Sequence, residues 1–83
     1  SLELAQGPIQ ATSPRLGVFV QLMRTVADKK LRREYRRRIA RVMRVRPDPT
    51  VLFIYVIKCA MHYHHYTMAR SMQQQGAELM NTY

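Results

Sequence analysis

The chain has 83 residues, which is enough for one small domain. A single cysteine, Cys59, excludes an internal disulfide and favours a reducing, cytoplasmic compartment. The longest apolar run, 51–57, is far shorter than the roughly 18 residues that a membrane-spanning helix takes. The formal net charge is +9. These totals favour a small basic protein over a disulfide-rich or membrane-spanning one.

The positive charge is concentrated in one segment of the chain. Residues 29–46 contain ten Lys/Arg and one Glu, a net of +9, while the remaining residues contain four basic and four acidic side chains. The imbalance therefore belongs to one structural element and not to the surface as a whole.

A short N-terminal segment precedes the first predicted helix. Residues 1–12 mix glycine, proline and small polar residues without a period, and they are predicted to be a flexible lead-in. Ser13 and Pro14 then suit the N-cap and first position of a helix, which we predict over 14–28. Gly17 costs this helix up to about 1 kcal/mol relative to Ala, and we expect it to permit close approach to a neighbour. The predicted apolar face consists of Leu16, Phe19, Val20, Met23, Val26 and Ala27.

The second predicted helix, 30–45, is the basic one. Its narrow apolar stripe consists of Leu31, Tyr35, Ile39 and Val42, with Val45 as a further candidate. Like charges spaced four residues apart on the other faces each cost roughly 0.2–0.5 kcal/mol, and a few opposite-charge pairs return similar amounts. We therefore expect this helix to depend on docking its stripe on a neighbour and to gain from a nearby anion.

The third predicted helix, 49–74, is the longest. Its N-terminus is clearly predicted, because Asp48 is a suitable N-cap and Pro49 is a suitable first helical residue. Its apolar run, 51–57, leaves no polar face, so we expect the other two helices to enclose it. Gly76 is the predicted stop, followed by a frayed tail.

These elements predict an all-α fold. No segment alternates in the way that a strand requires. The predicted architecture is a small three-helix bundle over 13–74, with a long apolar third helix packed against an apolar-faced first helix and a basic second helix. Residues 75–83 form the predicted tail.

The arginine-rich face of the second helix is the strongest candidate site. A helix of about 15 residues is roughly 22 Å long, so its guanidinium groups can meet several anionic groups. A solvated face, or contact with an acidic patch of a larger protein, explains these arginines as well. A single-strand binder would show interleaved aromatic residues, and this helix has only Tyr35. The candidate residues are Arg32, Arg33, Arg36, Arg37, Arg41 and Arg44.

The histidines of the third helix are a weaker candidate site. His62 and His65 share one side of the helix, while His64 and Cys59 lie on other sides. Zinc normally takes three or four ligands, so packing or half-buried polar roles are favoured over metal binding by His62 and His65. No nucleophile, acid and base occur together, and we expect no independent catalysis.

Tyrosine and methionine side chains form further stripes on the third helix. Core packing is the favoured interpretation, because methionine commonly fills irregular gaps. The alternative is a docking surface, since two short helices can leave part of a long one uncovered. The residues are Tyr55, Tyr63, Tyr66, Met61, Met68 and Met72.

Residues 15–72 resemble the helical C-terminal region, of unknown function, of cobalamin-binding-domain radical SAM proteins, including some hopanoid-biosynthesis enzymes. The resemblance is carried by RLGVFVQLMR, REYRRRIARVMR and RPDPTVLFIYVIKCAMHYH. In that family a basic helix with an aromatic residue reaches an Arg-Pro step, and an apolar helix ending near a tyrosine and a histidine follows. The matching residues here are Tyr35, Arg46, Pro47, Tyr63 and His62 or His64.

The resemblance implies that the chemistry lies outside this chain. A radical SAM cluster takes the three cysteines of a CxxxCxxC loop, whereas this sequence has one cysteine and no DxHxxG cobalamin motif. It therefore implies an accessory domain without a cofactor of its own. The iron–sulfur cluster, S-adenosylmethionine and cobalamin are expected in a parent enzyme. The expected partners are other domains of that enzyme or an anionic surface, including peripheral contact with a membrane. The alternative is a small basic nucleic-acid-binding protein.

Overall fold

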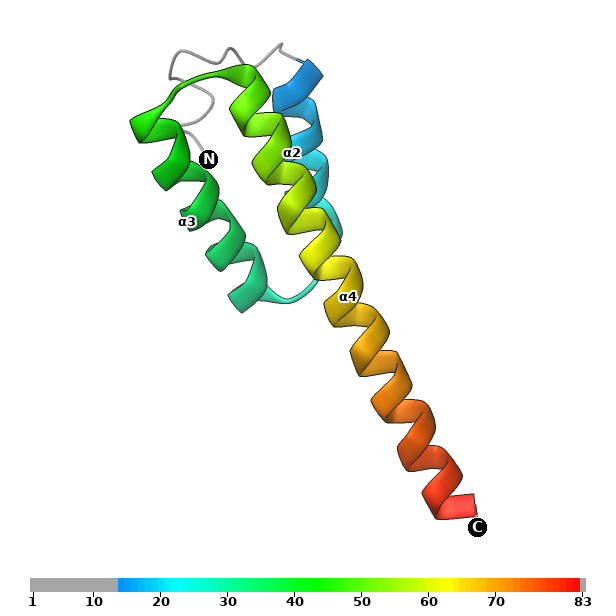
Figure 1. The fold of residues 1–83 in the computed structure, drawn as a ribbon. Coiled ribbons are helices and arrows are strands. Elements are labelled where there is room, and N and C mark those ends of the chain that lie inside the picture. Colours follow the sequence, from blue (N-terminus) through cyan, green and yellow to red (C-terminus); the bar gives the residue numbers. More distant parts are fainter. Residues whose placement is uncertain (1–13, 83) are drawn as a thin grey trace.

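The computed structural model describes residues 14–82 and contains three helices there: α2 (Pro14–Thr25), α3 (Lys29–Val45) and α4 (Pro49–Thr82). Both α2 and α3 pack against the first half of α4, and the second half of α4 extends beyond them (Figure 1). The molecule is therefore elongated, with extents of 57 × 19 × 18 Å. The predicted all-α, three-helix fold is confirmed. The predicted lead-in, 1–12, lies outside the described residues.

The core lies where α2 and α3 meet α4. Tyr35 and Ile39 are fully buried, so the basic helix is anchored by its apolar stripe. Met43 completes this stripe, whereas Val45 is 84% exposed because two further residues turn the helix by about 200°. The candidate role of Val45 was therefore wrong. The buried residues are Leu16, Phe19, Leu22, Met23, Val26, Tyr35, Ile39, Met43, Leu52, Val56 and Cys59.

The first helix ends earlier than predicted. Asp28 was expected to end α2, but it is the N-cap of α3, with extended backbone angles. Its Oδ1 accepts hydrogen bonds from the backbone nitrogens of Lys30 and Leu31, at 2.8 and 3.1 Å. A residue in this conformation cannot be part of the preceding helix, so α2 does not reach Asp28 and ends at Thr25.

The predicted apolar face of α2 was only partly correct. Val20 and Ala27 are exposed, and Leu22 is buried in their place. Gly17 is also exposed, and a Cβ added there would meet nothing within 4 Å. The expectation that Gly17 permits a close approach was therefore wrong.

The third helix begins as predicted and ends later. The backbone nitrogen of Thr50 donates to Oδ1 of Asp48 at 2.7 Å, which confirms the N-cap. The helix continues through Gly76 to Thr82, so the predicted stop and the frayed tail at 75–82 were wrong. Gly76 has no positive φ, and its cost of about 1 kcal/mol is tolerated among the good helix formers on either side of it.

One long side of α4 is not covered by the other helices. Leu52 and Val56 are buried, while Ile54 and Ile57 of the same apolar run are 45% and 39% exposed. The expectation that the other helices enclose this run was therefore wrong. The physical reason is that α2 and α3 pack where α4 buries Leu52, Val56 and Cys59, and these residues lie on one side of the helix.

Candidate anion-binding face

The candidate arginines of α3 lie on the surface around its anchored stripe. Arg33, Arg36, Arg37, Arg41 and Arg44 are exposed, and Arg32 is half-buried. They are distributed along a helix of 17 residues, about 26 Å long. Because Tyr35 and Ile39 face the core, the charged side chains are left on the remaining sides. The arrangement suits contact with an extended anionic surface.

Glu34 is the acidic residue within this basic segment. Its Oε1 accepts a hydrogen bond from Nε of Arg38 at 3.0 Å, and its Oε2 lies 3.6 Å from Nη1 of Arg37. These side chains are about half exposed, so the ion pairs contribute little to stability. One carboxylate leaves the large positive excess of α3 in place.

A small hollow between α3 and α4 brings three cationic side chains together. Arg38, Arg41 and Lys58 line it beside Tyr55 and Cys59, and its volume is about 240 Å³. The ammonium of Lys58 lies 4.7 Å from the centre of the Tyr55 ring. Converging cations against an aromatic wall suit a carboxylate or a phosphate group.

Sequence reasoning missed two residues of this hollow, Arg38 and Lys58. Lys58 directly follows the apolar run, 51–57, and was not proposed as a site residue. A signal was present, because a lone lysine after such a run is expected to seek an anion or an aromatic face. Its proximity to α3 follows from the packing of the helices and not from any spacing along the chain.

His62 is engaged by Tyr35 across the interface between α3 and α4. Nδ1 of His62 lies 2.5 Å from the hydroxyl oxygen of Tyr35, and the two rings meet edge to face with centroids 5.5 Å apart. Burial, followed by the nearby Cys59, raises the pKa of Tyr35. The hydroxyl therefore keeps its proton at neutral pH, and it shares a hydrogen bond with Nδ1 whose direction follows the tautomer of the imidazole.

The other weak metal candidate, His65, is placed beside His64 with ring centroids 5.9 Å apart. Across the part of the chain that the structure describes, no group of three or more His, Cys, Asp or Glu side chains is arranged to hold a metal ion. His62 and His65 therefore gather no further protein ligand among these residues.

Two tyrosines of α4 hold the connection between α2 and α3. The hydroxyl of Tyr63 accepts a hydrogen bond from the backbone nitrogen of Ala27 at 3.2 Å. The hydroxyl of Tyr66 donates to Oδ2 of Asp28 and accepts from Nη1 of Arg70, both at 3.3 Å. These bonds fix the N-terminal end of the basic helix on α4.

The electrostatics of Asp28 agree with this role. The hydrogen bond from the Leu31 backbone lowers the pKa of Asp28, and those from the Lys30 backbone and Tyr66 act in the same direction, against a smaller opposing effect of desolvation. The carboxylate is therefore ionised at neutral pH and serves the fold.

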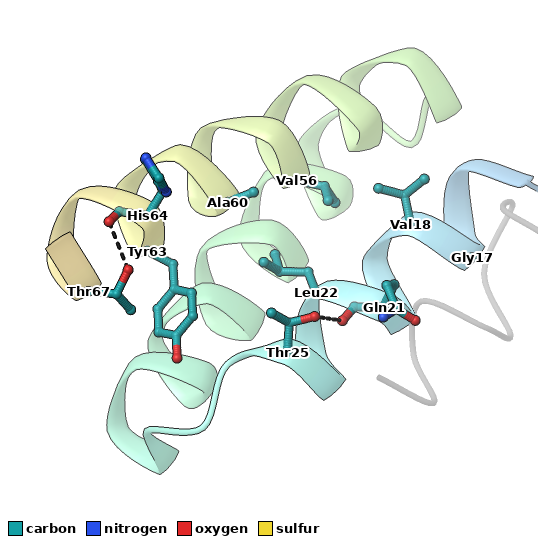
Figure 2. A pocket seen from close by; sticks show the side chains of 10 residues that line it. All are labelled: Gly17, Val18, Gln21, Leu22, Thr25, Val56, Ala60, Tyr63, His64 and Thr67. Atoms are coloured by element: carbon teal, nitrogen blue, oxygen red, sulfur yellow. Dashed lines mark hydrogen bonds between the residues drawn. The ribbon is translucent and has the colours of Figure 1, made fainter.

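A shallow apolar groove lies between α2 and α4, on the other side of the core (Figure 2). Its volume is about 680 Å³, and small residues such as Gly17 and Ala60 line it. The hydroxyls of Thr25 and Thr67 donate to carbonyl oxygens of their own helices, both at 2.8 Å (Figure 2). The groove therefore offers apolar contact and few free polar groups.

No known relative was found. Comparisons with protein-family models, with curated proteins and with solved structures gave no match. Within residues 14–82, none of the helices combines the length and apolar character needed to cross a bilayer.

Proposed function

We propose that this chain is a non-catalytic accessory domain that docks on, or caps, an anionic surface of a larger protein through the arginine-rich face of α3. The observation that supports this proposal is the separation of charge from core. Residues 29–46 have a net charge of +9, while Tyr35, Ile39 and Met43 of the same helix are buried. A helix built in this way is held by its apolar side and presents its charge to a partner.

The parent protein in this proposal is a cobalamin-dependent radical SAM enzyme. The support is the resemblance of residues 15–72 to the C-terminal region of such proteins. The iron–sulfur cluster, S-adenosylmethionine and cobalamin would then be bound by other domains. The anionic partner would be an acidic surface of those domains.

A non-catalytic role is supported by the use of the ionisable side chains. Asp28 caps a helix, Glu34 pairs with arginines of its own helix, and Tyr35 bonds to His62. Each has a structural partner, and together they do not form a nucleophile and base directed at a common cavity.

Nucleic acid is the alternative partner for the same arginines. The exposed arginines along α3 favour contact with phosphates. Base stacking on α3 is disfavoured, because Tyr35, the aromatic residue of that helix, is 0% exposed. This alternative is therefore limited to salt-dependent contact with the nucleic-acid backbone.

The test reverses the charge of three exposed arginines, in the variant R33E/R37E/R41E. Binding is measured to the remainder of the parent enzyme, to phosphatidylserine vesicles and to random duplex DNA. We expect the wild-type chain to bind the enzyme remainder and the reversed variant to lose this binding. The matched control, R33K/R37K/R41K, keeps the charge and should retain most of it.

Unchanged binding of the enzyme remainder by R33E/R37E/R41E would contradict the proposal. Micromolar binding to duplex DNA at physiological salt, with several counterions released, would favour the nucleic-acid alternative instead. Binding to vesicles alone would identify a lipid surface as the partner.

A further inference from the structure

The face of α4 opposite the core has an apolar stripe that is exposed to solvent. The helix turns by 100° per residue, so these residues lie within about 60° of one another and about half a turn from Val56 and Tyr63. Their exposure ranges from 39% at Ile57 to 67% at Met72. The six residues of this outer stripe are Ile54, Ile57, Met61, Met68, Met72 and Leu79.

The outer stripe follows an eleven-residue repeat. His65 and Gly76 occupy its two other positions and lie eleven and twenty-two residues after Ile54. The successive steps are three, four, four, three, four, four and three residues. Eleven residues make three turns of a nearly straight helix, so the stripe keeps one side over its whole length. The order of steps is the same in both directions, so the stripe is complementary to an antiparallel copy of itself.

The bundle supports one half of this stripe and leaves the other half without support. Residues 54–66 lie where α2 and α3 pack, and Tyr66 is the last half-buried residue of α4. From Thr67 to Thr82 every residue is exposed, and Figure 1 shows this half projecting beyond the bundle. An isolated helix of about 15 residues is marginal in water. The unsupported half is kept helical only by its continuity with the supported half, so a partner along it would add stability.

We propose that the outer stripe binds a second copy of this chain as an antiparallel helix pair. The two-fold axis passes between Tyr66 and Thr67, where the bundle ends. Each unsupported half then lies along the supported half of the other copy. In this arrangement the numbers of two facing residues add up to 133. Ile54 therefore faces Leu79 of the second copy, and Met61 faces Met72 of the second copy.

The remaining layers of this pairing also fit in size. Gly76 of one copy faces Ile57 of the other, so a residue without a side chain meets a large one. Met68 faces His65 at the centre. A parallel pairing in register would instead place glycine against glycine and leave a gap, which close packing disfavours. The two-fold antiparallel arrangement is an isologous interface of the usual kind for homodimers.

Charge favours a second copy in this orientation. The charged residue nearest the outer stripe is Lys58, and its ammonium lies over the Tyr55 ring, towards α3. Arg70 and Glu78 lie off the stripe, so none of the eight positions of the stripe itself is an acidic residue, a lysine or an arginine. The two basic helices would be offset along the pair by about 28 Å, well beyond the screening length of about 8 Å at physiological salt. Parallel pairing would place them at the same level.

The first test measures the mass of the whole chain by analytical ultracentrifugation over micromolar to millimolar concentrations. We expect a rise from 9.8 kDa to twice that mass, and the variant M61E/M72E should stay at the lower value. The matched control, Q73E/Q74E, adds the same charge to the same helix away from the stripe and should still dimerise. Since Met61 and Met72 are exposed, cooperative unfolding of M61E/M72E shows that the bundle remains folded.

The second test determines the orientation by disulfide formation in a Cys59→Ala background. A mixture of I54C and L79C chains should form the mixed disulfide, and I54C alone should form none. A self-linked I54C dimer would overturn the antiparallel pairing. A chain that stays at 9.8 kDa at every concentration, or a dimer that survives M61E/M72E, would overturn the proposal. Reversing the arginines of α3 leaves both results unchanged, so this inference is tested separately from the proposed function.

Discussion

A hydrogen bond between the hydroxyl of Tyr35 and Nδ1 of His62, over 2.5 Å, joins the basic helix α3 to α4. Replacing Tyr35 by Phe keeps the buried ring and removes this bond. We expect a loss of about 1 kcal/mol in the free energy of unfolding, measured by urea titration. Tyr55→Phe is the control, because Tyr55 is also packed against the core and its recorded contact, with the ammonium of Lys58, is made by the ring. An equal loss in both variants would contradict the role of the bond.

Stability should fall at alkaline pH. Burial raises the pKa of Cys59 above 9.0, and burial followed by Cys59 raises that of Tyr35 above 10.0. The folded chain thus keeps protons that the unfolded chain releases. The contribution of these two groups is full below about pH 9 and is lost as the pH rises from the unfolded pKa values through the raised folded ones.

Urea titrations between neutral and strongly alkaline pH measure this loss. In Cys59→Ala the decline should begin about one pH unit later, because only Tyr35 still contributes. The two proteins are compared by the slope of their free energy of unfolding with pH. The absolute values are not compared, because the substitution itself alters the core. A decline that begins at the same pH in both proteins would show that Cys59 does not contribute.

Asp28 should stabilise the connection between α2 and α3 in its ionised form. Its pKa is lowered mainly by the hydrogen bond from the Leu31 backbone. This contribution is present above the usual value of 3.8 and is lost as the pH falls below it. Asp28→Ala should lower the melting temperature at pH 7, whereas Asp28→Asn retains a capping oxygen and should lower it less. Both variants should lose part of the acid dependence seen in the wild-type protein.

Gly17→Ala should stabilise the bundle. The backbone is helical there, and the added Cβ would meet open space. The expected gain is up to about 1 kcal/mol in the free energy of unfolding, measured by urea or thermal denaturation. A loss of stability would mean that another part of the chain approaches Gly17 closely.

Added salt should raise the melting temperature. The arginines of α3 repel one another, and raising the ionic strength from about 0.01 M to about 1 M shortens the screening length from about 30 Å to about 3 Å. The increase should be smaller in R33Q/R37Q/R41Q, which lacks three of the repelling charges. Equal salt responses would show that this repulsion does not affect stability.

Local patterns in the sequence determined much of this structure. The spacing of Tyr35 and Ile39 predicted the buried side of the basic helix, because a helix of 3.6 residues per turn places such residues on one face. Asp48 and Pro49 predicted where α4 begins, because capping depends only on the residues at the end of the helix. The exposure of most arginines on α3 followed from the same periodicity.

Only the tertiary structure decided which side of α4 is buried. Residues 51–57 are apolar on every side, so their periodicity cannot distinguish Val56, which is buried, from Ile54 and Ile57, which are exposed. That choice depends on α2 and α3 lying on the same side of α4. The meeting of Lys58 with Arg38 and Arg41 has the same origin. Burial and contacts between helices are long-range properties, whereas caps and helix faces are local.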